Sequence, residues 1–89
     1  MLATNDWVGG YELDLVLRRG RTVVFCEVKS KSGRGLGDPL EMVTAEKQRR
    51  LTQAAESWLA VHSEHADCEA WFDVVGVGAG RVEHLRQAF

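Results

Sequence analysis

Two apolar runs with charged residues at their centres restrict the fold of this chain more than any other feature. The runs, Tyr11–Arg18 and Thr22–Lys29, are rich in β-branched and aromatic side chains, which favour β-strands. The intervening Arg18-Arg19-Gly20-Arg21 is typical of a turn. We therefore expect the two runs to form an antiparallel β-hairpin.

The hairpin would gather charge on one face of a sheet. Pairing about the turn places Asp14 opposite Glu27 and Glu12 opposite Lys29, and strand alternation directs all four side chains to one side. Two opposed carboxylates have Cβ atoms only about 4.5–5.5 Å apart, so they repel each other unless a cation lies between them. This pattern suits a divalent metal and a nucleophilic water. The alternative is a solvated sheet face on which Glu12 and Lys29 form a surface salt bridge.

Length and charge narrow the class of protein. The 89 residues, 45% of them apolar, suffice for one small domain with a single core. The net charge of −2 excludes a basic nucleic-acid coat, so any polyanion would have to bind a local patch. We find no apolar run of membrane-spanning length and no secretory signal. The two cysteines, Cys26 and Cys68, predict reduced thiols and a cytoplasmic protein.

The rest of the chain predicts an α/β fold with the order β-β-β-α-β-β and a mixed sheet. Further strands are expected at Leu2–Trp7, Trp71–Val77 and Arg81–Leu85. The main helix should run from Thr44 to about His62, because one apolar stripe recurs at helical spacing. The stripe consists of Leu51, Ala54, Ala55, Trp58, Leu59 and His62. A helical turn could also open at 38–41, with Asp38 as N-cap.

The start of that helix is polar and basic. Gln48 continues the apolar stripe, so it is either a boundary residue satisfied by water or backbone, or a group that orients a metal-bound water or a phosphate. A basic rim is expected from Lys31, Arg34, Lys47, Arg49 and Arg50. The rim is either a solvated surface or a set of contacts to nucleic-acid phosphates.

Other polar residues give weaker signals. His62, His65 and Cys68 are spaced three apart but lack an evident fourth zinc ligand. His84 is expected to be structural, and Asp73 could either approach the charged face or face solvent. Trp7 should be a core or sheet-cover residue, although it could also stack on an unpaired base.

The ordered motifs resemble one family across essentially the whole chain. They are Gly-Tyr-Glu-Leu-Asp-Leu-Val, Val-Val-Phe-Cys-Glu-Val-Lys-Ser-Lys-Ser, Gly-Asp-Pro-Leu-Glu-Met-Val-Thr, Lys-Gln-Arg-Arg-Leu, Phe-Asp-Val-Val-Gly-Val and Val-Glu-His-Leu-Arg-Gln-Ala-Phe. This set is similar to the YraN-like family of uncharacterised bacterial proteins. That family in turn resembles the PD-(D/E)XK nucleases, and among them the Holliday-junction resolvases.

The resemblance implies a restriction-endonuclease-like core with a metal site. Asp14, Glu27 and the backbone carbonyl of Val28 would bind Mg²⁺ or Mn²⁺, and Lys29 would hold or polarise the attacking water. Glu12 and Gln48 would be accessory catalytic residues. The implied substrate is DNA, branched or single-stranded, in repair or recombination.

The chain departs from the family pattern at two places. Family members generally begin with a helix that supplies another acidic residue, whereas Met1–Trp7 resembles the segment just after that helix. This predicts a single, N-terminally shortened domain over residues 1–89. The family also usually has Gly immediately before the first Glu, where this chain has Tyr11, preceded by Gly10.

Three functions remain open from the sequence. The first is a metal-dependent endonuclease. The second is a nucleic-acid-binding module whose catalytic site is degenerate. The third is an interaction or assembly protein, such as a homodimer, that uses an uncovered sheet face or an edge strand.

Overall fold

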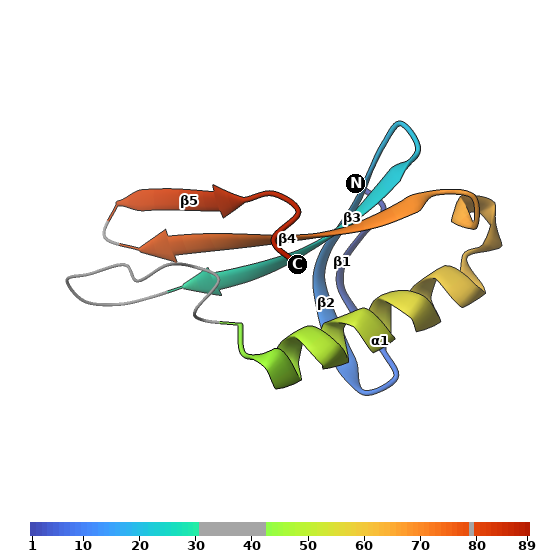
Figure 1. The fold of residues 1–89 in the computed structure, drawn as a ribbon, viewed down its shortest axis with the longest axis horizontal. Coiled ribbons are helices and arrows are strands. Elements are labelled where there is room, and N and C mark those ends of the chain that lie inside the picture. Colours follow the sequence, from blue (N-terminus) through green and yellow to red (C-terminus); the bar gives the residue numbers. More distant parts are fainter. Residues whose placement is uncertain (31–42, 79) are drawn as a thin grey trace.

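The computed structural model describes residues 1–30, 43–78 and 80–89 and contains one five-stranded sheet with one long helix (Figure 1). The elements are β1 (Ala3–Val8), β2 (Tyr11–Arg19), β3 (Thr22–Ser30), α1 (Ala45–Val61), the short 3-10 helix η2 (Ser63–His65), β4 (Glu69–Gly78) and β5 (Arg81–Leu85). This confirms the predicted α/β class and the order β-β-β-α-β-β. Lys31, Arg34 and the helical turn expected at 38–41 lie outside the described residues.

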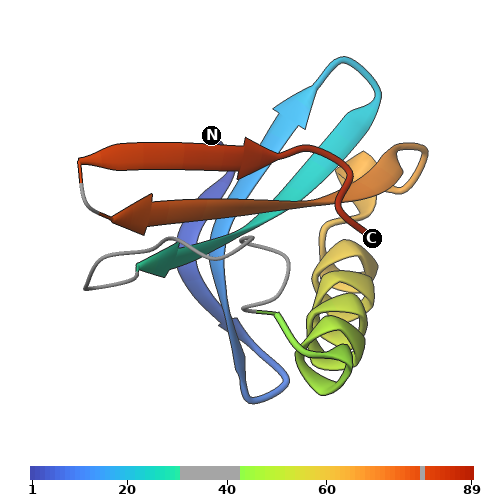
Figure 2. The same cartoon turned by 60° about the vertical axis from the view of Figure 1, so that its left-hand side comes forward.

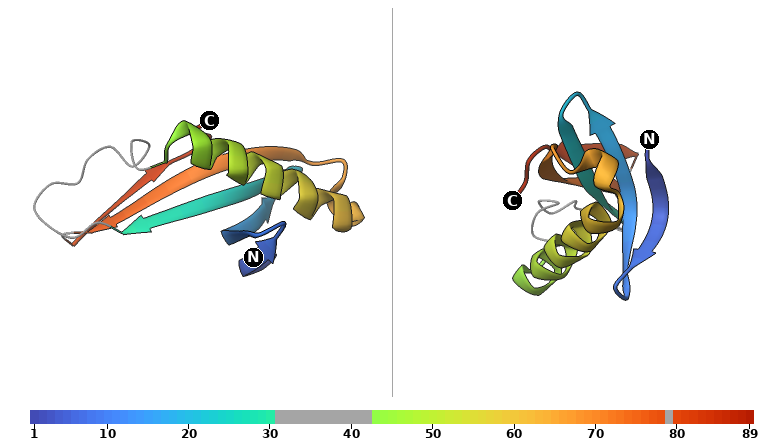
Figure 3. Two further views of the ribbon diagram at one scale, coloured as in Figure 1. Left: turned by 90° about the horizontal axis from the view of Figure 1, so that it is seen from below. Right: turned by 90° about the vertical axis from the view of Figure 1, so that its right-hand side faces the viewer.

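The sheet is mixed, as predicted, and its strands lie side by side in chain order. β3 and β4 pair in parallel, while the other three neighbouring pairs are antiparallel. The parallel pair requires a long connection, and α1 provides it by crossing one face of the sheet (Figures 2 and 3). No helix in the described parts of the chain is long and apolar enough to cross a membrane.

Helix α1 begins where the sequence predicts. The Thr44 side chain caps it by accepting a hydrogen bond from the Lys47 N–H at 3.2 Å. Trp58, fully buried, packs edge-on against Phe25 of β3 with ring centroids 5.9 Å apart. Its Nε1 donates to Asp6 Oδ2 of β1 at 3.1 Å. These contacts fix the helix to β1 and β3.

The β2–β3 hairpin has the predicted register. Its ladder runs from Arg19 paired with Thr22 to Leu15 paired with Cys26, and Gly20 takes a positive φ of 60° at the turn. One further step in the same register aligns Asp14 with Glu27.

Beyond that point the strands depart from simple alternation. Leu13 and Val16, three residues apart, are both buried in the core under α1, although regular alternation would place them on opposite faces. The β1–β2 ladder is interrupted at the same level, because it skips the partner pair formed by Asn5 and Asp14. Asn5 has a positive φ of 49°, an uncommon conformation for a residue other than glycine. The local irregularity changes which side chains face the helix.

This irregularity makes the sequence prediction for Glu12 wrong. Tyr11 and Leu13 both pack on the helix side of the sheet, so Glu12 between them points to the opposite side. Its ladder partner is Trp7, a side chain that is 67% exposed. Glu12 therefore does not share a face with Lys29, and the expected cluster of four charges reduces to three.

Candidate functional site

Asp14 and Glu27 lie near each other just beyond the end of the β2–β3 ladder. Asp14 Oδ2 accepts a hydrogen bond from the Val28 N–H at 2.9 Å. This side-chain oxygen takes the place of a backbone carbonyl just beyond the last paired residues of the ladder, Leu15 and Cys26. The Asp14 carboxyl lies close enough to the Glu27 side chain for their charges to interact, and Glu27 is only 6% exposed. Burial, followed by the proximity of Asp14, raises the pKa of Glu27. Such a pair requires a proton or a cation between its members.

Two further groups favour the ionised form of Glu27. Lys29 Nζ lies 3.7 Å from Glu27 Oε1, and the Tyr11 hydroxyl donates to Glu27 Oε2 at 3.0 Å. Burial and the charge of Glu27 raise the pKa of Tyr11, so its phenol stays protonated and donates at neutral pH. Sequence reasoning missed Tyr11, because regular alternation from Asp14 would have placed it on the other face.

A second ammonium group lies beside Lys29. Lys47 projects from the first turn of α1, and the positive charge of Lys29 lowers the pKa of Lys47. Two cations that approach each other are unfavourable unless an anion lies nearby. Glu27 acts on Lys47 in the opposite sense, so the two ammonium groups and Glu27 form one charged cluster.

The other polar residues at the start of α1 are already engaged. Gln48 Nε2 donates to the Val43 carbonyl at 3.2 Å, which is the backbone-satisfied arrangement left open from the sequence. Arg49 forms an ion pair with Glu46, and Arg50 Nε lies 3.8 Å from Glu46 Oε1. The basic rim on α1 is present, but Glu46 neutralises part of it.

The site offers few ligands to a metal. Among the residues that the structure describes, no group of three or more His, Cys, Asp or Glu side chains could hold a metal ion. Mg²⁺, however, is usually bound through one or two carboxylates, with waters and substrate phosphates completing the octahedron. Asp14 and Glu27 supply two carboxylates close together, which fits that requirement.

The three histidines and Cys26 have roles outside the candidate metal site. The rings of His62 and His65 both stack on Trp58, which gives them a packing role. His84 Nε2 lies 2.7 Å from Oδ2 of the buried Asp73, on the sheet face away from α1. Burial and nearby carboxylates raise the pKa of Cys26 to about 11, so it is a thiol at neutral pH.

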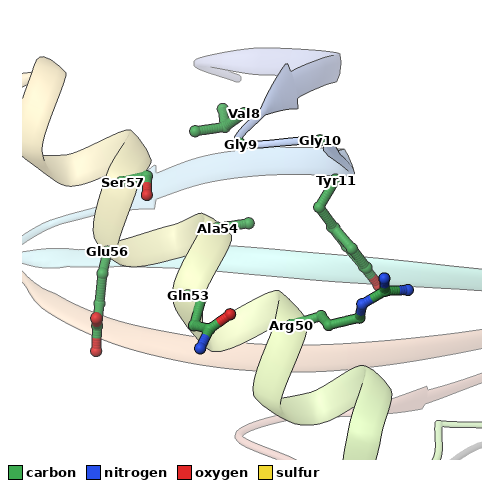
Figure 4. Close-up of a pocket in the computed structure, with 9 residues that line it drawn as sticks. All are labelled: Val8, Gly9, Gly10, Tyr11, Arg50, Gln53, Ala54, Glu56 and Ser57. Atoms are coloured by element: carbon green, nitrogen blue, oxygen red, sulfur yellow. The ribbon is translucent and has the colours of Figure 1, made fainter.

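A hollow of about 530 Å³ opens beside Tyr11, between the β1–β2 turn and α1 (Figure 4). It is lined by Val8, Gly9, Gly10, Tyr11, Arg50, Gln53, Ala54, Glu56 and Ser57. Figure 4 shows the Arg50 side chain reaching toward the Tyr11 hydroxyl. Tyr11 thus borders both the hollow and the carboxylate pair.

Comparison with known proteins places the chain in a family. The model of the uncharacterised protein family UPF0102 matches residues 1–77. The chain belongs to UPF0102. This confirms the resemblance to the YraN-like family of uncharacterised bacterial proteins.

Individual relatives agree with the UPF0102 assignment. A UPF0102 protein of Frankia alni is 51% identical over 83 residues, an alignment that covers 88% of this chain and 68% of the relative. One from Beutenbergia cavernae is 52% identical over 80 residues, covering 84% of this chain and 67% of the relative. One from Acidothermus cellulolyticus is 39% identical, covering all of this chain and 78% of the relative.

Proposed function

We propose that this UPF0102 chain is a metal-dependent endonuclease that hydrolyses phosphodiester bonds in DNA. The observation that carries the proposal is the proximity of Asp14 to buried Glu27, with Lys29 Nζ 3.7 Å from Glu27. An Asp on one strand and a Glu-x-Lys on the next, side by side, is also the pattern on which the resemblance to PD-(D/E)XK nucleases rests. We extend the proposal to branched or single-stranded DNA in repair or recombination, as the family resemblance implies, and to a cytoplasmic location, as the two cysteines predict.

Each residue has a distinct role in the proposed reaction. Asp14 and Glu27 would hold Mg²⁺ or Mn²⁺, and the Val28 carbonyl is the third ligand that the resemblance implies. When bound, the metal neutralises phosphate charge and lowers the pKa of a coordinated water. Tyr11 holds one Glu27 oxygen by its 3.0 Å hydrogen bond, which leaves the other directed to Lys29.

Hydrolysis itself requires attack of a water oxygen on phosphorus and cleavage of one P–O ester bond, with a proton delivered to the departing oxygen. Lys29 would orient the attacking water and stabilise the negative charge that develops on the phosphate. Lys47, whose charge interacts with that of Lys29, would add a second cation near the phosphate. Positioning and charge stabilisation supply most of the catalysis in phosphate chemistry.

The test is a cleavage assay with Mg²⁺ and Mn²⁺ on single-stranded, duplex and four-way-junction DNA. We expect metal-dependent products from the unaltered chain and none from Glu27→Ala. Glu64→Ala is the matched control, because Glu64 is exposed on η2 and its loss removes the same charge. Equal cleavage by the unaltered chain and Glu27→Ala would rule out this catalytic site.

A binding module without turnover is the second candidate. It is favoured by the small ligand set, since the described residues bring together only two carboxylates. In that case DNA would bind in a salt-dependent manner with no cleavage in either metal. The same assay, run beside a binding measurement, separates the two functions.

A further inference from the structure

We propose that the hollow between the β1–β2 turn and α1 binds one nucleotide of a single-stranded DNA segment, adjacent to the bond that is cut. The inference rests on the proposed function, because it takes the Asp14–Glu27 pair as the reaction centre. It adds the place where the strand lies and the residues that hold it.

The hollow adjoins the Asp14–Glu27 pair through Tyr11. Tyr11 lines the hollow and donates its hydrogen bond to Glu27, so a chain that passes the carboxylate pair enters the hollow within one side chain's length. The hollow on the other side of the sheet, which Asp73 and His84 line, lacks this connection to the pair.

The hollow has the volume of a small-molecule pocket. A volume of about 530 Å³ lies within the roughly 300–1,000 Å³ of pockets that hold small molecules. It suits a single nucleotide and is too small to enclose a stack of base pairs. A duplex would therefore have to open before its strand could occupy this position.

The walls of the hollow combine charged, polar and apolar side chains. Arg50 stands at the end nearest Tyr11 (Figure 4) and offers a guanidinium to a phosphate. Val8 and Ala54 are the apolar side chains of the wall, and Gln53, Glu56 and Ser57 of α1 complete its polar part. Phosphate would thus lie at the Arg50 end, with sugar and base over the apolar part.

The turn contributes main-chain donors. Gly9 and Gly10 have positive φ angles of 59° and 82°, the conformation of a two-residue hairpin turn. Within the described residues, neither amide N–H has a backbone hydrogen-bond partner. A Cβ at either position would meet open space, so the backbone is accessible to a ligand.

Ser57→Trp provides the test, because a large ring there would fill the hollow. Ala60→Trp is the matched control, since Ala60 is exposed on α1 and does not line the hollow. All variants carry Glu27→Gln, which prevents turnover. Affinity for a fluorescent oligothymidylate is measured by anisotropy, and a thermal melt verifies that each variant is folded.

We expect Ser57→Trp to weaken binding at least tenfold, the equivalent of about 1.4 kcal/mol, and Ala60→Trp to stay within about twofold. Arg50→Gln, which cannot disturb the core because Arg50 is exposed, should weaken binding about three- to tenfold. In NMR spectra the Gly9 and Gly10 amide signals should shift on addition of the oligonucleotide.

The outcomes separate the two proposals. Equal binding by Ser57→Trp and Ala60→Trp overturns the nucleotide site, even if the unaltered chain cuts DNA. Binding lost in Ser57→Trp, with no cleavage in any metal, supports the nucleotide site and overturns the nuclease. No binding by any form of the chain overturns both.

Discussion

Tyr11 and Glu27 are joined by a 3.0 Å hydrogen bond from the first residue of β2 to a buried position on β3. The hydrogen bond acts against the effect of burial, because it favours the carboxylate over the carboxylic acid. Tyr11 therefore favours the ionised form of Glu27, which is the form that the proposed metal requires.

Tyr11→Phe should shift metal binding to higher pH. Without the hydroxyl, the pKa of Glu27 rises further, so protons compete with the metal over a wider pH range. We expect the pH midpoint of Mn²⁺-dependent thermal stabilisation to rise, with a stability loss of about 1 kcal/mol for the hydrogen bond. An unchanged midpoint would show that the hydroxyl does not influence Glu27.

Glu27→Gln should stabilise the metal-free protein at neutral pH. Since the folded-state pKa of Glu27 is raised, the stability that Glu27 contributes is full below about pH 4, near its unfolded pKa, and is lost as pH rises through the folded value. We expect a gain of roughly 1 kcal/mol, or several °C, at pH 7 and little difference at pH 4. The measurement is thermal unfolding in EDTA.

Added Mg²⁺ should reverse that order. The unaltered chain gains stability from a ligand that binds only the folded state, whereas Glu27→Gln lacks one metal ligand. Glu64→Gln, which removes an exposed carboxylate, should behave like the unaltered chain. A Glu27→Gln protein that responds fully to Mg²⁺ would place the metal elsewhere.

Glu12→Ala distinguishes the sequence expectation from the structure. The family resemblance makes Glu12 an accessory catalytic residue, but its side chain faces away from Glu27. We expect Glu12→Ala to retain cleavage within about twofold, while Lys29→Ala loses at least about 100-fold. A loss for Glu12→Ala as large as that for Lys29→Ala, in a protein with an unchanged melting temperature, would restore Glu12 to the site.

Glu46→Gln should strengthen DNA binding. Glu46 pairs with Arg49 and Arg50, so its removal frees both guanidinium groups for phosphates. Affinity should rise a few-fold, and the dependence of log affinity on log salt should steepen by roughly 0.7 for each new contact with a single strand. Glu64→Gln controls for net charge, and an equal gain in that variant would mean that the effect is not local.

Asp73→Ala should destabilise the end of the chain. Asp73 is buried, and its Oδ1 accepts from the Gln87 N–H at 2.9 Å while Oδ2 contacts His84. Loss of these partners should cost about 1–3 kcal/mol in unfolding free energy. Glu83→Ala, which among the described residues removes a single ion pair, with Arg81 at 4.0 Å, should cost less than about 0.5 kcal/mol. Equal costs would argue against a structural role for Asp73.

Local patterns were sufficient for much of this protein. The elements follow from short-range features, namely β-branched runs, the helical stripe around Leu51 and Trp58, and the Thr44 cap, and each was predicted to within a few residues. The register of the β2–β3 hairpin follows from a turn at Gly20, so the alignment of Asp14 with Glu27 was also accessible. These features depend on neighbours in sequence, which determine backbone conformation and strand alternation.

Only the tertiary structure decided the composition of the site. The positive φ of Asn5, on a different strand from Asp14, coincides with the change of face that excludes Glu12 and brings in Tyr11. The approach of Lys47 to Lys29, and of Arg50 to Tyr11, depends on how α1 lies across the sheet. Such contacts join residues that are far apart in the chain. Core packing fixes their geometry, and no periodicity in a single sequence records it.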